Sequence, residues 1–342
     1  MKKNSLTILK FLFFLSIGVL LIWLVIKDKT DEEISNITQS LRRADYSWIL
    51  LSVVISAVSH YLRALRWKIL LEPLNHFPKT STTFFAVMVG YLANCAVPRL
   101  GEVTRCGILT RYSKVPFIQG FGSVIGERAL DVICLILIFF LMLALEFSRI
   151  SGIADQLIFS FFSGKADLLV QNRTVLIIGI ITLLLMAGII YYFRKKISAL
   201  LSGKVKGFLK GLWDGLKSIK DVHKPRTFIL YTILIWLMYI LQVYVCFFAL
   251  AETSHLSFGV AVVITVFGSI GIAVVPGGTG AYQYIVILIL TSVYLIAEPP
   301  AFAFAWSVWA SQISLILVLG LVSLILLPLM NKEIPASVPD KK

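Results

Sequence analysis

The chain has 342 residues, 58% of them hydrophobic, and its mean hydropathy is +0.89. Because about half of an ordinary soluble domain is apolar even when glycine is counted, these values exclude that class and indicate a polytopic membrane protein. The formal net charge is +14, but no soluble module accompanies the basic residues, so a nucleic-acid partner is not expected. The four cysteines are far apart and form no CxxC pair, which predicts apolar packing residues and no metal or cofactor.

Nine apolar runs predict an all-α, polytopic helical membrane protein with about 7–9 hydrophobic segments. The first run follows Lys2 and Lys3 and, at about 21 residues, is long enough to be a retained membrane span. The runs are Leu6–Ile26, Trp48–Leu62, Phe84–Val97, Ala129–Leu145, Val175–Phe193, Phe228–Leu250, Phe258–Val275, Ala281–Ala297 and Ala301–Leu329. Together they predict a single membrane-embedded domain over residues 1–331 and a disordered tail over residues 332–342.

Basic residues set the expected orientation. The segment from Arg194 to Arg226 holds ten Lys or Arg residues and two acids. Its apolar residues recur every three or four positions, so residues 195–226 are predicted to form a cytoplasmic amphipathic helix on the inner leaflet. Nine full crossings from a cytoplasmic N-terminus would place this segment outside. We therefore expect Phe84–Val97, which is too short to cross, to be one arm of a re-entrant hairpin, with both termini in the cytoplasm of a bacterial plasma membrane.

Two short breaks interrupt apolar runs, VPRLGE at Val97–Glu102 and VPGGTG at Val275–Gly280. Proline and glycine leave backbone groups that hydrocarbon cannot satisfy, so each break predicts a polar chamber inside the bilayer. The second break makes Phe258–Ala297 either two spans or a second hairpin that enters from the outer side. Two opposed hairpins would indicate an inverted repeat with a site near the midplane, and the sequence leaves this repeat open.

Two connections outside these runs have their own predictions. The charged stretch Asp28–Asp45 is expected to be a short surface helix on the outer side. The stretch Glu146–Arg173 is expected to be an external loop with two short apolar stretches.

Charged residues gather in two apolar segments. Glu127, Arg128 and Asp131 share one face of a predicted helix, where each charge costs about 2.5 to 3.5 kcal/mol at the bilayer centre. They form either a self-neutralising cluster that holds helices together or the lining of a lipid headgroup or ion pathway. His60, Arg63 and Arg66, each three residues apart, form a basic stripe that ends at Trp67. This stripe fits interfacial anchoring, and its two arginines also fit a phosphate clamp.

Four motifs together resemble the flippase-like transmembrane domain of lysylphosphatidylglycerol synthases, a family with stand-alone integral membrane members. The motifs are RALRW at 63–67, NCAVPRLGEVTR at 94–105, ERALD at 127–131 and PGGTG at 276–280. The resemblance covers nearly the whole chain. It implies a membrane domain that moves an anionic or modified phospholipid, or a polyprenyl-linked lipid, between leaflets. Aminoacyl transfer is not implied, because that chemistry belongs to a soluble C-terminal domain for which this chain has no counterpart.

The leading functional hypothesis is a lipid transporter that is not an enzyme. The residues expected to bind the headgroup are Arg63, Arg66, Asn94, Arg99, Glu102, Arg105, Glu127, Arg128, Asp131, Gly277, Gly278 and Gly280. No nucleotide-binding motif is present, so transport would be facilitated or coupled to a proton or ion gradient. One alternative is a membrane-embedded, polyprenyl-phosphate-dependent transferase, although the sequence has no DxD or HExxH motif. Another is a non-transporting membrane partner of a lipid-modifying system.

Overall fold

The computed structural model describes residues 30–97, 99–171 and 221–331, and in these ranges the chain is helical without β-strands. Four helical segments are long and apolar enough to cross a membrane: Tyr46–Leu74, Phe117–Glu146, Pro225–Ala249 and Glu298–Met330. The predicted class, a polytopic helical membrane protein, is thus confirmed. The predicted spans Leu6–Ile26 and Val175–Phe193, most of the basic segment 195–226 and the tail 332–342 lie outside the described residues.

The chain divides into two compact units, residues 1–145 with 212–342, and residues 146–211. Helix α6 (Phe117–Gln171) continues from the first unit into the second and departs from helical geometry at Glu146, where φ is −123° and ψ is 16°. The predicted external loop at Glu146–Arg173 is therefore wrong as far as residue 171. No proline interrupts this stretch, and its apolar residues allow the helix to continue. The site described below lies wholly in the first unit.

The first unit begins with α2 (Asp31–Arg43), the short helix expected before Asp45, followed by α3 (Tyr46–Leu71). Asp45 caps α3, because its Oδ1 accepts a hydrogen bond from the backbone N of Ser47 at 3.0 Å. Hydrogen bonds from Ser47 also hold the pKa of Asp45 below its usual value. Helix α3 ends in a 3-10 turn, η1 (Glu72–Leu74).

Two helical hairpins follow, each with its break at the tip. The first consists of α4 (Thr80–Ala96) and α5 (Leu100–Ser113), and the second of α10 (Phe258–Val274), the 3-10 turn η3 (Pro276–Gly278) and α11 (Ala281–Ser292). Each arm has 17 residues or fewer, short of the roughly 20 that a full span needs. Left-handed backbone interrupts both tips, at Arg99 (φ 65°) and at Gly277 (φ 63°). The breaks predicted from VPRLGE and VPGGTG are thus present.

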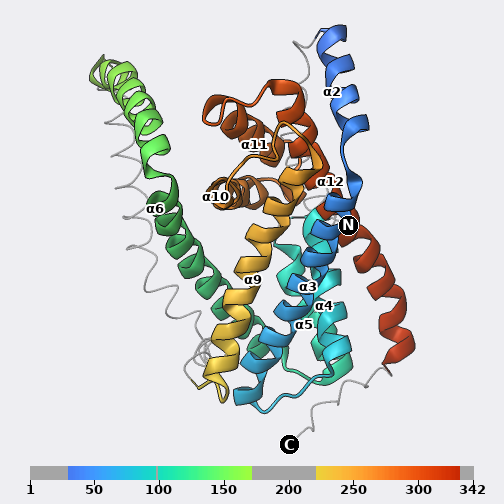
Figure 1. Cartoon of the computed structure of the whole chain (residues 1–342). Coiled ribbons are helices and arrows are strands. Elements are labelled where there is room, and N and C mark those ends of the chain that lie inside the picture. The colour runs from blue at the N-terminus through green and yellow to red at the C-terminus, as the bar shows by residue number, and fades with distance from the viewer. Residues whose placement is uncertain (1–29, 98, 172–220, 332–342) are drawn as a thin grey trace, which may run out of the picture. The chain divides into compact units, whose positions relative to one another are not determined.

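The long helices α3 and α9 (Pro225–Cys246) lie side by side and antiparallel. At one end, the backbone N of Asp45 donates to the carbonyl oxygen of Ala249, in the 3-10 turn η2 (Phe247–Ala249), at 2.8 Å. At the other end, Lys224 Nζ lies 3.2 Å from Glu72 Oε1. Since the first hairpin follows the end of α3 and the second follows the end of α9, the two hairpins enter from opposite ends of this unit (Figure 1).

The last helix, α12 (Glu298–Met330), runs back toward the end where the first hairpin begins. There the hydroxyl of Thr82 donates to Oδ1 of Asn331 at 2.6 Å. The order of a long helix, a broken hairpin and another long helix therefore occurs twice, in α3–α4–α5–α6 and in α9–α10–α11–α12, with the first helices of the two sets antiparallel. This arrangement has the element order and direction of the inverted repeat that the sequence left open.

Candidate functional site: a cavity between the hairpin tips

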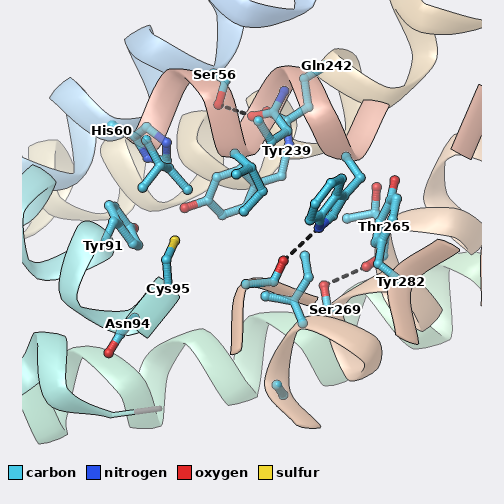
Figure 2. Close-up of a pocket in the computed structure, with 18 of the residues that line it drawn as sticks. Ser56, His60, Tyr91, Asn94, Cys95, Tyr239, Gln242, Thr265, Ser269 and Tyr282 are labelled. Carbon is cyan, nitrogen blue, oxygen red and sulfur yellow. Dashed lines mark hydrogen bonds between the residues drawn. The ribbon is translucent and has the colours of Figure 1, made fainter. Parts of the chain in front are cut away.

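The tips of the two hairpins meet beside a cavity of about 520 Å³. A Cβ atom placed on Gly277 would lie 4.0 Å from Sγ of Cys95, near the end of α4. Trp309 of α12 holds the second tip, because its Nε1 donates to the carbonyl oxygen of Gly277 at 2.8 Å. Figure 2 shows side chains from both hairpins and from α9 around the cavity. Its volume lies in the range typical of small-molecule sites.

A buried ion cluster adjoins this cavity, with Glu127 of α6 near its centre. The side chain of Glu127 is fully buried. Its Oε1 lies 2.9 Å from Arg63 Nε and 3.1 Å from an Arg66 nitrogen, while its Oε2 lies 3.1 Å from Arg105. Arg63 and Arg66 are three residues apart on α3, so both guanidinium groups reach the same carboxylate. Helices α3, α5 and α6 are thereby joined through one buried charge.

Asp131, one turn further along α6, extends the cluster. It accepts hydrogen bonds from Arg63 and from Arg66, the latter at 2.7 Å. Arg128 lies 3.0 Å from Glu102 of α5 and 3.7 Å from Asp131. Charges predicted separately from RALRW, LGEVTR and ERALD therefore converge in one cluster, as their cost in hydrocarbon required.

The interfacial alternative for the basic stripe of α3 is wrong. Arg66 and Trp67 are both fully buried. Trp67 Nε1 donates to the hydroxyl of Ser123 at 3.0 Å, and the Arg105 guanidinium lies over the Trp67 ring, 4.7 Å from its centroid. An interfacial anchor would leave the indole at the headgroups. These side chains instead fill the interior between α3, α5 and α6.

The cluster has a closed part and an open part. Arg66, Arg105 and Glu127 do not line the cavity and are at most 4% exposed. The open part does line it and consists of Arg63, Glu102, Arg128 and Asp131, together with Arg99 at the first tip. The burial of the closed part fits the structural alternative, and the open part lines the cavity. That the open part forms a headgroup or ion pathway stays a prediction.

Asn94 and two of the three predicted glycines support the backbone of the hairpin tips. Asn94 lines the cavity, but its Oδ1 accepts a hydrogen bond from the backbone N of Gly101 at 2.7 Å and so caps the start of α5. Of the three predicted glycines, Gly277 lines the cavity, whereas Gly278 and Gly280 do not. Both of the latter have positive φ, 70° and 78°, and so shape the turn.

Sequence reasoning missed most of the uncharged lining. Tyr91 accepts a hydrogen bond from Arg63 and lies beside the open part of the cluster. Polar or amphipathic side chains also come from α3, α9, α10, α11 and α12: Ser56, Trp236, Tyr239, Gln242, Thr265, Ser269, Tyr282, Trp309 and Gln312. A usable signal existed for Gln242 and Gln312, because an amide inside a membrane span is costly unless it has a partner or a function.

The helical hairpins, the opposed repeat and the charged cavity define a polytopic helical membrane protein with a charged cavity inside its helical domain. The chain belongs to the family described as the lysylphosphatidylglycerol synthase TM region, whose model matches residues 8–321. This confirms the resemblance drawn from the four motifs. The family's description connects it with a membrane lipid.

A UPF0104 membrane protein of Methanothermobacter thermautotrophicus is 27% identical to this chain over 271 residues. The matched region covers 74% of this chain and 77% of the relative. No solved structure matches the chain. Because this relative is archaeal, it does not test the predicted location in a bacterial plasma membrane. That location and the cytoplasmic orientation of both termini stay predictions.

Proposed function

We propose that the chain is a flippase-like transporter that moves an anionic phospholipid or polyprenyl-linked lipid between leaflets, and that it is not an enzyme. The observation that carries the proposal is the cavity between two opposed hairpin tips, lined in part by a charged cluster. Hydrocarbon cannot solvate a headgroup, so a polar compartment inside the membrane domain lowers the barrier to its passage. The supporting architecture is that of inverted-repeat transporters, whose sites lie where the repeats meet.

The balance of charge suits an anionic headgroup. Together with Arg99, the cluster holds five guanidinium groups and three carboxylates, which leaves two positive charges in excess. The side chain of Arg128 is 40% exposed, and its Nε has no hydrogen-bond partner among the described residues. A guanidinium with free N–H groups is well suited to a phosphate. We assign phosphate binding to Arg99 and Arg128, while carboxylates occupy Arg63 and Arg66 and hold them in place.

The proposed orientation follows from the basic residues at one end of the unit. One lysine lies at each of three helix ends there: Lys79 before α4, Lys114 after α5 and Lys224 before α9. Basic residues favour the cytoplasmic side, so the first hairpin would enter from the cytoplasm and the second from outside. The cavity between their tips could then open to each side in turn. Coupling to a proton or ion gradient is part of the same proposal.

Lipid exchange in proteoliposomes tests this function. Acyl-labelled phosphatidylglycerol would be reconstituted with the protein, and its loss from the inner leaflet followed with an impermeant quencher. Arg99→Ala and Arg128→Ala should each slow exchange at least about tenfold, because each removes a charge-assisted contact worth roughly 1.5 to 3 kcal/mol. Lys224→Gln, which alters a surface ion pair, is the matched control.

Two outcomes would count against the proposal. Parental exchange rates in both folded arginine variants would remove the assigned phosphate site. The alternatives, a polyprenyl-phosphate-dependent transferase and a non-transporting partner, both predict that even the unaltered protein exchanges no lipid.

A further inference from the structure

The cavity has two chemically different halves. Its charged lining comes from α3, the first hairpin and α6: Arg63, Arg99, Glu102, Arg128 and Asp131. The lining contributed by α9, the second hairpin and α12 contains no aspartate, glutamate, lysine, arginine or histidine. No Lys or Arg occurs anywhere between Thr227 and Asn331. One end of a ligand would therefore meet charge, and the other would meet only uncharged groups.

The uncharged half has unused hydrogen-bonding capacity. Oε1 of Gln242 and the hydroxyl of Tyr282 are buried, and neither has a hydrogen-bond partner in the part of the chain that the structure describes. Thr265 donates to the carbonyl oxygen of Ala261 at 2.7 Å, which leaves its hydroxyl oxygen free to accept. Buried polar atoms without partners are uncommon in proteins, and here they line a cavity that can hold a ligand.

Gln312 adds an amide to this half. Its Oε1 accepts from the hydroxyl of Ser56, but its Nε2 lies 3.5 Å from Ser52 Oγ, at the limit of a hydrogen bond. The amide N–H groups are therefore weakly used. Figure 2 shows Ser56 and Gln242 on one side of the cavity, Ser269 on the other, and the Tyr239 ring between them. The half thus combines donors, acceptors and aromatic surface.

Such a surface suits a ligand group that has both C–H bonds, which pack on aromatic rings, and hydroxyl groups, which form hydrogen bonds. Tyr239 and Trp309 present apolar rings with polar tips, and the amides and hydroxyls can each bond a hydroxyl as donor or acceptor. An ammonium group would find only neutral acceptors and aromatic rings in the uncharged half, with no carboxylate to pair its charge. A buried cation without a counter-charge is costly.

The carboxylates of the charged half are already engaged by arginines. Glu127 and Asp131 each contact at least two guanidinium groups, and Glu102 contacts Arg128 through one oxygen. Among the carboxylate oxygens of the residues that line the cavity, only Oε2 of Glu102 is buried without a hydrogen-bond partner within the described ranges. A cationic headgroup would bring a further positive charge beside a cluster that already has an excess of them.

We propose that the group beyond the phosphate in the carried lipid is uncharged and hydroxylated, a glycerol or a sugar, and that it binds the half of the cavity formed by α9, the second hairpin and α12. This inference rests on the proposed function and names the substrate class of the same site. It excludes a lipid whose headgroup ends in an amine. The phosphate faces Arg99 and Arg128, while the hydroxyl groups face Gln242, Gln312 and Tyr282.

Binding of a set of short-chain lipids to the full-length protein in detergent tests the inference. The set consists of dioctanoyl phosphatidic acid, dioctanoyl phosphatidylglycerol, farnesyl phosphoglucose and dioctanoyl lysylphosphatidylglycerol, with dissociation constants from tryptophan fluorescence. The glycerol or glucose lipid should bind about 3- to 10-fold more tightly than phosphatidic acid, the gain expected from one or two neutral hydrogen bonds. Lysylphosphatidylglycerol should bind at least tenfold more weakly than phosphatidylglycerol. Whichever of phosphatidylglycerol and farnesyl phosphoglucose binds more tightly identifies the hydroxylated group as a glycerol or a sugar.

Variants connect this preference with the uncharged half. Gln242→Leu combined with Gln312→Leu should lower the ratio of the two affinities, glycerol or glucose lipid over phosphatidic acid, by about 3- to 10-fold. Gln39→Leu makes the same exchange on α2, where the side chain is exposed, and should leave this ratio unchanged.

The outcomes separate this inference from the function on which it rests. Lysylphosphatidylglycerol binding as tightly as phosphatidylglycerol, or an unchanged ratio in the double variant, would overturn the inference while Arg128-dependent binding of phosphatidic acid upheld the transporter. Failure of every lipid to bind or exchange would overturn both.

Discussion

Replacement of Glu127 by glutamine is the most direct test of the buried cluster. Glutamine keeps the size of the side chain but removes the negative charge that contacts Arg63, Arg66 and Arg105. Arg63, Arg66 and Arg105, each at most 5% exposed, would then keep only the carboxylate contacts that Asp131 makes with the first two. Breaking a buried ion pair by removing one partner costs about 3 to 5 kcal/mol, so we expect a destabilisation of that order.

Thermal unfolding in one fixed detergent, followed by tryptophan fluorescence, would measure this loss. The apparent Tm of Glu127→Gln should fall by roughly 10 °C. Lys224→Gln removes one partner of the pair with Glu72, and because the Lys224 side chain is 60% exposed, its effect should lie within about 0 to 1 kcal/mol. Arg128→Gln should also unfold close to the parent, yet it should lose lipid exchange.

The contrast between these variants separates the structural part of the cluster from the phosphate site. If Glu127→Gln unfolds within about 2 °C of the parent, Glu127 is not the counter-ion of a dry cluster, and the division into closed and open parts fails. If Arg128→Gln is as unstable as Glu127→Gln, Arg128 belongs to the structural part and not to the phosphate site.

Three further predictions concern orientation and the first hairpin. On a cysteine-free background, a cysteine at position 224 should react with impermeant thiol reagents only from the cytoplasm, and one at position 255 only from outside; the reverse pattern would invert the topology. Gly101→Ala should destabilise the fold by more than about 2 kcal/mol, because its Cβ would lie 2.1 Å from a carbonyl oxygen of α4, whereas Gly107→Ala, with nothing within 4 Å, should be close to neutral; equal melting of the two would show that α4 and α5 can separate freely. Asn94→Ala should cost about 1 kcal/mol in unfolding by denaturant through loss of the α5 cap, and an unchanged midpoint would assign Asn94 to the ligand alone.

The sequence predicted the hairpins well because their breaks depend on local chemistry. Pro276 cannot donate a backbone hydrogen bond, and Gly277 and Gly278 adopt positive φ, so residues within a few positions determine the second tip. The same reasoning explains the error after Glu146. There the sequence has charge and two glycines but no proline, and helical structure continued where a loop was expected.

The site could be predicted only in part, since its partners come from distant segments. The cost of isolated charges required Arg63, Glu127 and Asp131 to find one another, whatever the details of the fold. Nothing local in the sequence shows that Asn94 turns to cap α5, or that Gln242 and Gln312 face one cavity, because their positions depend on the antiparallel packing of α3, α9 and α12. Residues that carry charge were therefore found, and uncharged lining residues were missed.

The close approach of Gly90 and Gly101 has a mechanical consequence. Because the backbones of α4 and α5 meet there without intervening side chains, and Asn94 ties them again, the two helices cannot slide past each other. The first hairpin is flanked by Asn75 and Lys114, which both have left-handed backbone geometry, with φ of 59° and 56°. A displacement of the tip of the first hairpin therefore requires α4 and α5 to move together as one unit.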